Sequence, residues 1–141
     1  MKVHPYLNFD GTAEEAFDFY KSVFGGEFKD KNRMSEAPGG DKLPEDEKNR
    51  LMHISLPIGN GIFLMASDII PSAGHKLQAG NQTYVLLDIK DKAEADRLFN
   101  GLSEAGEIEM EMADTFWGAY FGSFADKYGI RWMINCDPNA E

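Results

Sequence analysis

The stretch from residue 5 to residue 28, PYLNFDGTAEEAFDFYKSVFGGEF, constrains the fold more than any other, because it predicts a strand, a helix and a glycine stop in succession. Leu7 and Phe9 alternate with polar residues, which is the pattern of a strand with one buried face. Thr12 and Glu15 have the spacing of a capping box, in which two side chains satisfy free backbone amides at a helix start. We therefore predict a helix that begins near Thr12.

The predicted helix carries one apolar stripe. Apolar residues recur at intervals of three and four, while Glu14, Asp18 and Lys21 fall on the opposite face. The stripe consists of Ala13, Ala16, Phe17, Tyr20 and Phe24. Gly25 and Gly26 supply the left-handed backbone geometry that ends a helix. We expect the stripe to pack against the apolar face of the preceding strand.

The other face of that strand carries His4, Tyr6 and Asn8. Since the side chains of a strand change face at every residue, these three point away from the helix. A curved sheet could enclose a ligand on that side. We therefore take all three as candidate ligand-binding residues.

The composition is that of a globular protein. Of 141 residues, 43% are hydrophobic, and the formal net charge of −10 argues against nucleic acid and anionic membranes as partners. No apolar run reaches the ~20 residues of a membrane-spanning helix, and the start of the chain shows no secretory pattern. The lone Cys136 excludes an intrachain disulfide, so we expect a cytoplasmic protein.

Three more strands are predicted in the first half of the chain. Residues 27–34 form one, and residues 51–58 form another with clear alternation. Its apolar face carries Met52, Ile54, Leu56 and Ile58. His53 lies on the opposite, polar face and is a further candidate ligand contact. A Gly-Asn-Gly turn at residues 59–61 joins this strand to residues 62–67 as a hairpin.

Two segments of this half have no apolar periodicity. Residues 35–50 are charged and contain proline and glycine, and residues 68–81 are also interrupted by proline and glycine. Loops of such length within a compact domain are either mobile or lids over a site. We predict irregular structure for both, with that alternative left open.

The second half repeats the order of the first. Residues 84–89 predict a strand, and Asp91 with Glu94 forms a second capping pair. The helix that follows has its own apolar stripe of Ala95, Leu98, Phe99 and Leu102. Three strands, at residues 107–114, 118–125 and 130–136, then close the copy.

A constant shift of 80 positions places Leu87 on Leu7 and Gly106 on Gly26, which we interpret as a weak internal duplication. The predicted fold class is therefore α+β, with two βαβββ modules side by side. We place the modules at residues 1–67 and 82–136 of a single domain that spans residues 1–141.

Two βαβββ modules in one chain resemble the vicinal-oxygen-chelate superfamily, which includes glyoxalase I, extradiol dioxygenases and the bleomycin- and fosfomycin-resistance proteins. Three motifs, PYLNFDGTAEEAFDFYKSVFGG, LMHISLPIG followed by FLMASD, and TFWGAYFGSFADKYGIRWMINC, look like the PhnB-like branch. Members of that branch also carry a 3-demethylubiquinone 3-methyltransferase-like label, but the chain lacks the glycine-rich turn of a nucleotide-like cofactor site. The resemblance implies a cupped mixed sheet, and a homodimer.

The resemblance also implies a metal site built from the first, fourth, fifth and eighth strands, with His, Glu or Gln ligands. His4 and Gln82 could contribute, but residues 62–67 offer no such donor. Met133 stands where related proteins place a glutamate, and a neutral thioether does not hold a hard dication. We therefore expect no metal and no other cofactor.

The remaining candidates lie in the second half. Trp117 and Tyr120 could stack on a planar ligand, whereas the parity of Trp132 assigns it to the core. Arg131 shares the face of Met133, where it either binds an anionic group or forms a surface salt bridge. The complete set of candidate ligand-binding residues is His4, Tyr6, Asn8, His53, Met65, Trp117, Tyr120, Arg131 and Met133.

Two functions remain open at this point. The first is a protein that binds a small, partly aromatic or anionic molecule in the sheet cavity without a complete metal site. The alternative is a metal-dependent lyase or oxygenase of the same superfamily. No catalytic residue is assigned, because His4 and His53 could each be a general base or a structural, hydrogen-bonded histidine.

Overall fold

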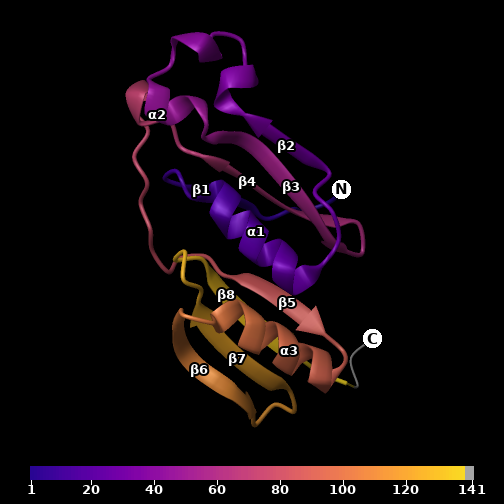
Figure 1. Cartoon of the computed structure of the whole chain (residues 1–141). Helices are drawn as coiled ribbons and strands as arrows, with labels where there is room; N and C mark the ends of the chain where they lie inside the picture. The colour runs from indigo at the N-terminus through magenta and orange to yellow at the C-terminus, as the bar shows by residue number, and fades with distance from the viewer. Residues whose placement is uncertain (139–141) are drawn as a thin grey trace. The chain divides into compact units, whose positions relative to one another are not determined.

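The computed structural model describes residues 1–138 and contains two compact units, Met1–Gln78 (unit 1) and Ala79–Glu141 (unit 2). Each unit holds one four-stranded sheet with a helix lying along one face, as Figure 1 shows for α1 and α3. Among the described residues, no helix is both long enough and apolar enough to cross a membrane.

Unit 1 contains the first module. Its main elements are β1 (Tyr6–Phe9), α1 (Ala13–Phe24), β2 (Asp30–Arg33), β3 (Leu51–Gly59) and β4 (Ile62–Asp68). The strands lie in the order β1-β4-β3-β2, with β1 parallel to β4 and the other neighbours antiparallel. The hairpin predicted at residues 59–61 joins β3 to β4, as expected.

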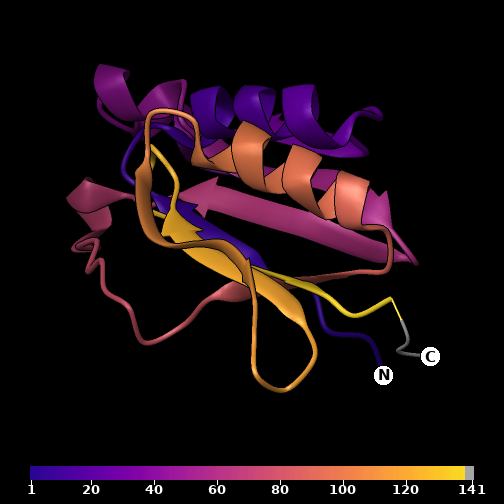
Figure 2. The same cartoon turned by 90° about the horizontal axis from the view of Figure 1, so that it is seen from below.

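Unit 2 repeats this arrangement. Its elements are β5 (Val85–Ile89), α3 (Lys92–Ser103), β6 (Glu107–Asp114), β7 (Tyr120–Ala125) and β8 (Arg131–Cys136). The strand order β5-β8-β7-β6 matches that of unit 1, again with one parallel pair. Figure 2 shows α3 along one face of this sheet. The predicted α+β class with two βαβββ modules is confirmed.

The pairing registers extend the likeness to single residues. On the side of the sheet away from α1, Met65 of β4 lies between Tyr6 of β1 and Ser55 of β3. In unit 2, Met133 of β8 lies in the same way between Leu86 and Ser123. The central strand of each sheet therefore presents a methionine on the face without a helix.

The helices bury the apolar stripes that the sequence predicts, except that one residue replaces another at the end of α1. Phe9 and Phe17 pack edge to face with ring centroids 6.4 Å apart, and both are almost fully buried. At the end of α1, Val23 is buried and Phe24 is only half buried. All four predicted stripe residues of α3 are buried, and Trp132 of β8 is fully buried with them, as predicted.

Helix α1 is capped by a distant strand. The backbone of Thr12 has φ −109° and ψ 11°, outside the extended geometry of an N-cap, and its side chain makes no capping hydrogen bond. Instead, Oδ1 of Asp68 accepts hydrogen bonds from the N–H groups of Gly11 and Ala13 at 2.9 and 3.0 Å. The predicted capping box of Thr12 and Glu15 is therefore wrong, because Thr12 lacks the cap geometry and a carboxylate from β4 binds the neighbouring N–H groups of Gly11 and Ala13 instead.

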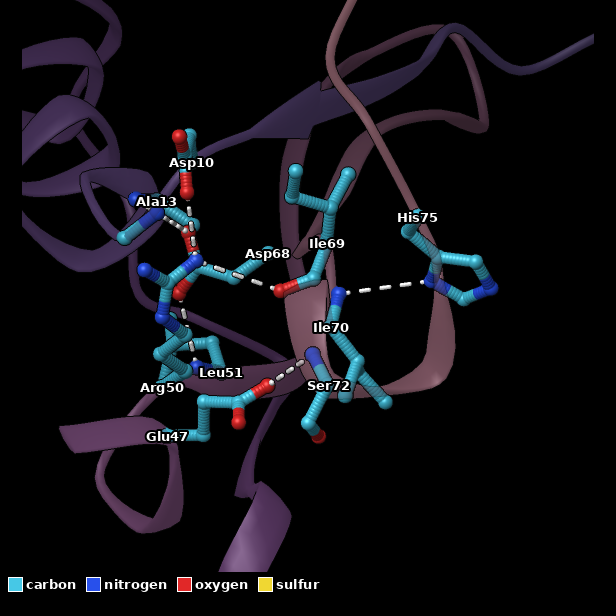
Figure 3. A network of polar contacts seen from close by, with 11 residues as sticks. Asp10, Ala13, Glu47, Arg50, Leu51, Asp68, Ile69, Ile70, Ser72 and His75 are labelled. Carbon is cyan, nitrogen blue, oxygen red and sulfur yellow. Dashed lines mark hydrogen bonds and ion pairs between the residues drawn. The ribbon is translucent and has the colours of Figure 1, made fainter. Parts of the chain in front are cut away.

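The same carboxylate also holds β3. Oδ2 of Asp68 accepts a hydrogen bond from the N–H of Leu51 at 2.8 Å, and the residue is only 4% exposed (Figure 3). A buried carboxylate is tolerated when such donors replace its lost hydration. One side chain thus fastens the start of α1, the start of β3 and the end of β4. In α3 the predicted cap is confirmed, since Asp91 accepts from the N–H of Glu94 at 3.2 Å.

Further polar contacts surround Asp68 and join the two segments predicted as loops (Figure 3). Nη1 of Arg50 donates to Oδ1 of Asp10 at 2.8 Å and to the carbonyl of Ile69 at 3.2 Å. The buried Glu47 accepts a hydrogen bond from the N–H of Ser72 at 3.0 Å. The two segments are therefore fastened to each other.

The first of these segments is more regular than predicted. It contains short helical turns at η1 (Met34–Glu36), η2 (Gly40–Lys42) and α2 (Glu45–Lys48), and the second contains η3 (Pro71–Ala73). Helices of one turn are too short to give an apolar period, so the sequence pattern could not reveal them. Strand β2 is also shorter than the predicted residues 27–34, since it begins only at Asp30 and η1 begins at Met34.

The predicted apolar face of β3 is interrupted at Met52. Asn32 pairs with His53 and Arg33 with Leu51, so Met52 is the extra residue of a β-bulge. The bulge changes the alternation, and as a result Leu51 is fully buried while Met52 is 39% exposed. The prediction that Met52 shares the buried face of Ile54 is therefore wrong.

An ion-pair cluster joins α1 to the edge strand β2. Glu14 lies 2.6 Å from Nζ of Lys31 and 2.8 Å from Nη2 of Arg33. The hydrogen bond from Arg33, followed by that from Lys31, lowers the pKa of Glu14 from 4.5 to about 2. The cluster therefore stays ionised in all but strongly acidic solution.

We predict that Asp68→Ala lowers the free energy of unfolding by about 3 kcal/mol, because two buried N–H groups and one partly buried N–H group lose their acceptor at about 1 kcal/mol each. Thr12→Ala is expected to change it by less than about 0.5 kcal/mol, as for a surface residue without a capping bond. Asp91→Ala provides the reference of an ordinary cap, at about 1 kcal/mol. Urea unfolding of the three variants checks the ranking, and equal losses for Asp68→Ala and Thr12→Ala would contradict it.

Candidate functional site

Six of the nine candidate residues lie on the side of a sheet opposite the helix of the same unit, namely Tyr6, Asn8, His53, Met65, Arg131 and Met133. We call this side of each sheet its open face. In unit 1 it is defined by Tyr6 and Asn8 of β1, which alternate with the buried Leu7 and Phe9. Residues paired across the strands point to the same side, so the registers assign the remaining members.

Tyr6 and His53 meet on the open face of unit 1. The Tyr6 hydroxyl lies 3.2 Å from Nδ1 of His53. The two rings have centroids 5.8 Å apart and planes within 25° of parallel. Tyr6 is nevertheless 49% exposed. The pair therefore forms a fixed aromatic surface that the core of unit 1 does not cover.

Met65 and Ser55 lie next to this pair in the sheet. Met65 is half buried beside Tyr6, and its thioether side chain can adapt to different shapes. Ser55 is fully buried and its hydroxyl donates to Oδ2 of Asp30 at 3.3 Å. The exposed Asn8 extends the open face along β1. A polar and partly aromatic surface with a flexible centre results.

His4 has a local structural partner. Its Nδ1 accepts a hydrogen bond from the backbone N–H of Phe63 at 3.0 Å, and the two rings lie 5.6 Å apart. The contact ties the segment before β1 to β4. It occupies one of the two ring nitrogens of His4.

The open face of unit 2 carries an ion pair. Nη1 of Arg131 donates to Oε2 of Glu109 at 2.9 Å, and the Tyr84 hydroxyl lies 2.9 Å from both oxygens of Glu109. The side chains of Arg131 and Glu109 are 27% and 32% exposed. Arg131 thus points to the open face beside Met133, as the parity of β8 predicts, and forms a salt bridge there.

The two aromatic candidates of unit 2 lie elsewhere. The Tyr120 hydroxyl donates to Oδ1 of Asp96 on α3 at 2.7 Å, which raises the pKa of Tyr120 to about 12. Tyr120 therefore belongs to the helix side of its sheet. Trp117 is 60% exposed in the turn between β6 and β7, where its ring packs on the edge of Phe116. The structure brings neither ring to the Arg131 and Glu109 pair.

The residues that were missed had weak sequence signals. Glu109 and Tyr84 help to form the open face of unit 2, but β6 has register shifts on both sides of Met110. These irregularities break the alternation from which a face could be predicted. The role of Asp68 required knowledge of a tertiary contact between the end of β4 and the start of α1.

The donor set does not fit a divalent metal. Phe63, Met65 and Ser67 are the β4 residues on the open face, and none is a His, Glu, Gln or Asp. On β8 the corresponding face carries the Arg131 cation, the soft Met133 thioether and Asn135, whose side-chain amide donates to Asp88 at 3.2 Å. A hard dication requires several oxygen or nitrogen donors around one point. Within the part of the chain that the structure describes, no three His, Cys, Asp or Glu side chains form a group that could hold a metal ion.

The fold and these open faces agree with a known family. Residues 2–134 match the Glyoxalase/Bleomycin resistance protein/Dioxygenase superfamily. The chain therefore belongs to this superfamily, and the resemblance noted in the sequence is confirmed.

Its relatives indicate the branch of the superfamily to which the chain is similar. Protein YjdN of Escherichia coli K12 is 33% identical over 96% of this chain and 95% of that protein. The structure of protein PA1353 from Pseudomonas aeruginosa has a TM-score of 0.85 and 36% identity, covering 97% of this chain and 98% of that one. The structure of the PhnB protein from Bacillus cereus has a TM-score of 0.76 and 26% identity, covering 96% and 99%. The expected likeness to the PhnB-like branch is thus confirmed.

The donor chemistry predicts the response to metals. Adding Ni(II), Zn(II), Mn(II) or Fe(II) should leave the melting temperature unchanged. A metal at one hundred times its dissociation constant and bound only to the folded form would add about 2.7 kcal/mol, which a thermal melt detects. Met133→Glu places a carboxylate where the resemblance to the superfamily implies a metal ligand. It is the variant with which the wild type is compared. Tight binding of one metal per wild-type chain, abolished by His4→Ala, would contradict the prediction.

Proposed function

We propose that this protein binds a small planar molecule on the open face of unit 1, without the help of a metal ion. The observation that carries the proposal is the pair of Tyr6 and His53, whose nearly parallel rings are held together by a hydrogen bond and remain accessible. Aromatic rings are large, rigid surfaces, and stacking on them is worth about 0.5–1.5 kcal/mol beyond the burial of area.

The geometry around the pair suits a planar ligand. Each ring restricts the orientation of the other, so a ligand loses little free energy in ordering them. Met65 lies beside Tyr6 and can adjust its side chain to the outline of a bound molecule. Asn8 is exposed on the same strand face and offers amide donors and an acceptor for the polar edge of the ligand.

Binding is favoured over metal-dependent catalysis by the chemistry of the donors. The lyases and oxygenases expected of the superfamily need a metal, and the open faces present methionine, serine and arginine at the strand positions concerned. We also propose that the protein is a cytoplasmic homodimer, as the sequence suggests. The dimer expectation rests on the superfamily resemblance and is tested by light scattering.

The proposal is tested with neutral planar probes. Isothermal titration with 2-naphthol, indole and quinoline should show saturable binding, and cyclohexanol should bind more weakly than 2-naphthol. Tyr6→Ala is expected to weaken the binding of the planar probes by about tenfold, which is the equivalent of a stacking contact of about 1.4 kcal/mol. His53→Ala should weaken them as well, whereas Tyr6→Phe retains the ring and should lose less.

Phe116→Ala is the matched control. Phe116 is 98% exposed and belongs to unit 2, so its removal deletes an accessible aromatic ring that is not a member of the Tyr6 and His53 pair. Binding should be unchanged in this variant. Equal affinity of 2-naphthol for the wild type and Tyr6→Ala, or equal loss in Phe116→Ala, would refute the assignment of the site.

A further inference from the structure

Unit 2 contains a hollow beside the turn between β7 and β8. Its volume is about 340 Å³, at the lower end of the roughly 300–1,000 Å³ found for small-molecule sites. Much of its lining is glycine and alanine, including Gly106, Ala125 and Gly129. Because these side chains are small or absent, the charged groups of the lining remain accessible to a ligand.

Among these charged groups, Arg131 is the one whose side chain is already held in position by a salt bridge. Its guanidinium is fixed by Glu109, which accepts one of its N–H groups at 2.9 Å and is itself held by Tyr84. A guanidinium has five N–H donors, so this bond leaves others to a ligand in the hollow. Because the salt bridge has already ordered the arginine, an anion that binds there avoids most of the ordering cost.

The other ionised groups of the lining are Lys127, Glu107 and Asp126. Asp126 is engaged within the turn, because its carboxylate accepts from the N–H groups of Tyr128 and Ile130 and from the indole of Trp132. The lining therefore offers a second cation, Lys127, whose ammonium lies 5.7 Å from the centroid of the Tyr128 ring, and one exposed carboxylate, Glu107.

We propose that this hollow binds a small organic acid through its carboxylate, with Arg131 as the principal contact and Lys127 as the second. A guanidinium matches the planar geometry of a carboxylate and can donate two parallel hydrogen bonds to it. The volume fits a molecule about the size of an amino acid. Glu107 lies in the same lining and is placed to favour acids that also carry an ammonium group. All residues of its lining belong to unit 2, whereas Tyr6 and His53 belong to unit 1.

The test is a titration followed by amide NMR at constant ionic strength, with sodium acetate, glycine and ethylammonium chloride as probes. Acetate and glycine should shift the amide signals of Gly106 and Gly129 saturably, and glycine should bind the more tightly. Ethylammonium should not shift them saturably. Shifts that do not saturate, or equal saturable shifts with ethylammonium, would overturn the proposal.

Variants identify the contacts. Arg131→Met should weaken the binding of acetate by at least about tenfold, a change that corresponds to losing a charged contact. Lys127→Met should weaken it less. Arg97→Met is the matched control, because Arg97 pairs with Glu94 on α3, and it should leave binding unchanged. Unchanged affinity in Arg131→Met would refute the site.

Two additional arms keep the test decisive. If Arg131→Met fails to fold, Arg131→Lys retains the charge but loses the planar fork, and it should still bind acetate several times more weakly. The same acetate titration on Tyr6→Ala should match the wild type. An effect of Tyr6→Ala on acetate would show that the hollow is not an independent site and would overturn the proposal.

Discussion

The buried carboxylate of Asp68 is the interaction on which the structure of unit 1 depends. It accepts three backbone hydrogen bonds, two from the start of α1 and one from Leu51 at the start of β3. The strands that carry Tyr6 and His53 are therefore tied at the same end, since β1 leads into α1 and His53 lies two residues after Leu51. The aromatic surface proposed to bind a ligand rests on this fastening.

The internal duplication allows the capping of the helix start to be compared between the two units. The registers align Leu7 and Ala66 with Leu87 and Ile134, which places Cys136 of β8 at the position of Asp68. Helix α3 has its own N-cap in Asp91, so the end of β8 needs no carboxylate, and a buried thiol next to the carbonyl of Lys90 suffices. The methionines at the centres of the open faces are conserved between the halves, but their neighbours differ. Met65 lies between Tyr6 and Ser55, whereas Met133 lies on the face that carries the ion pair of Arg131 and Glu109.

Periodicity was enough to predict most of the fold, because α1 and α3 each bury one stripe, and β1, β4 and β8 alternate between buried and more exposed residues. It failed where a tertiary contact replaced a local one, as with Asp68 and Thr12, and where a bulge reversed the alternation at Met52. The candidate site was partly predictable by the same reasoning. Strand parity assigned Tyr6, His53 and Arg131 to open faces, but it could not show that Tyr120 turns to α3 and that Glu109 forms a salt bridge with Arg131.

Amide hydrogen exchange in Asp68→Ala, which removes both carboxylate oxygens, tests the central role of this carboxylate most directly. The account predicts that the amides of Gly11, Ala13 and Leu51 lose protection together, because one acceptor group serves all three. The amide of Ala95 in α3, whose cap is separate, should keep its protection. Unchanged exchange at Gly11 and Ala13, or an equal loss at Ala95, would contradict the account.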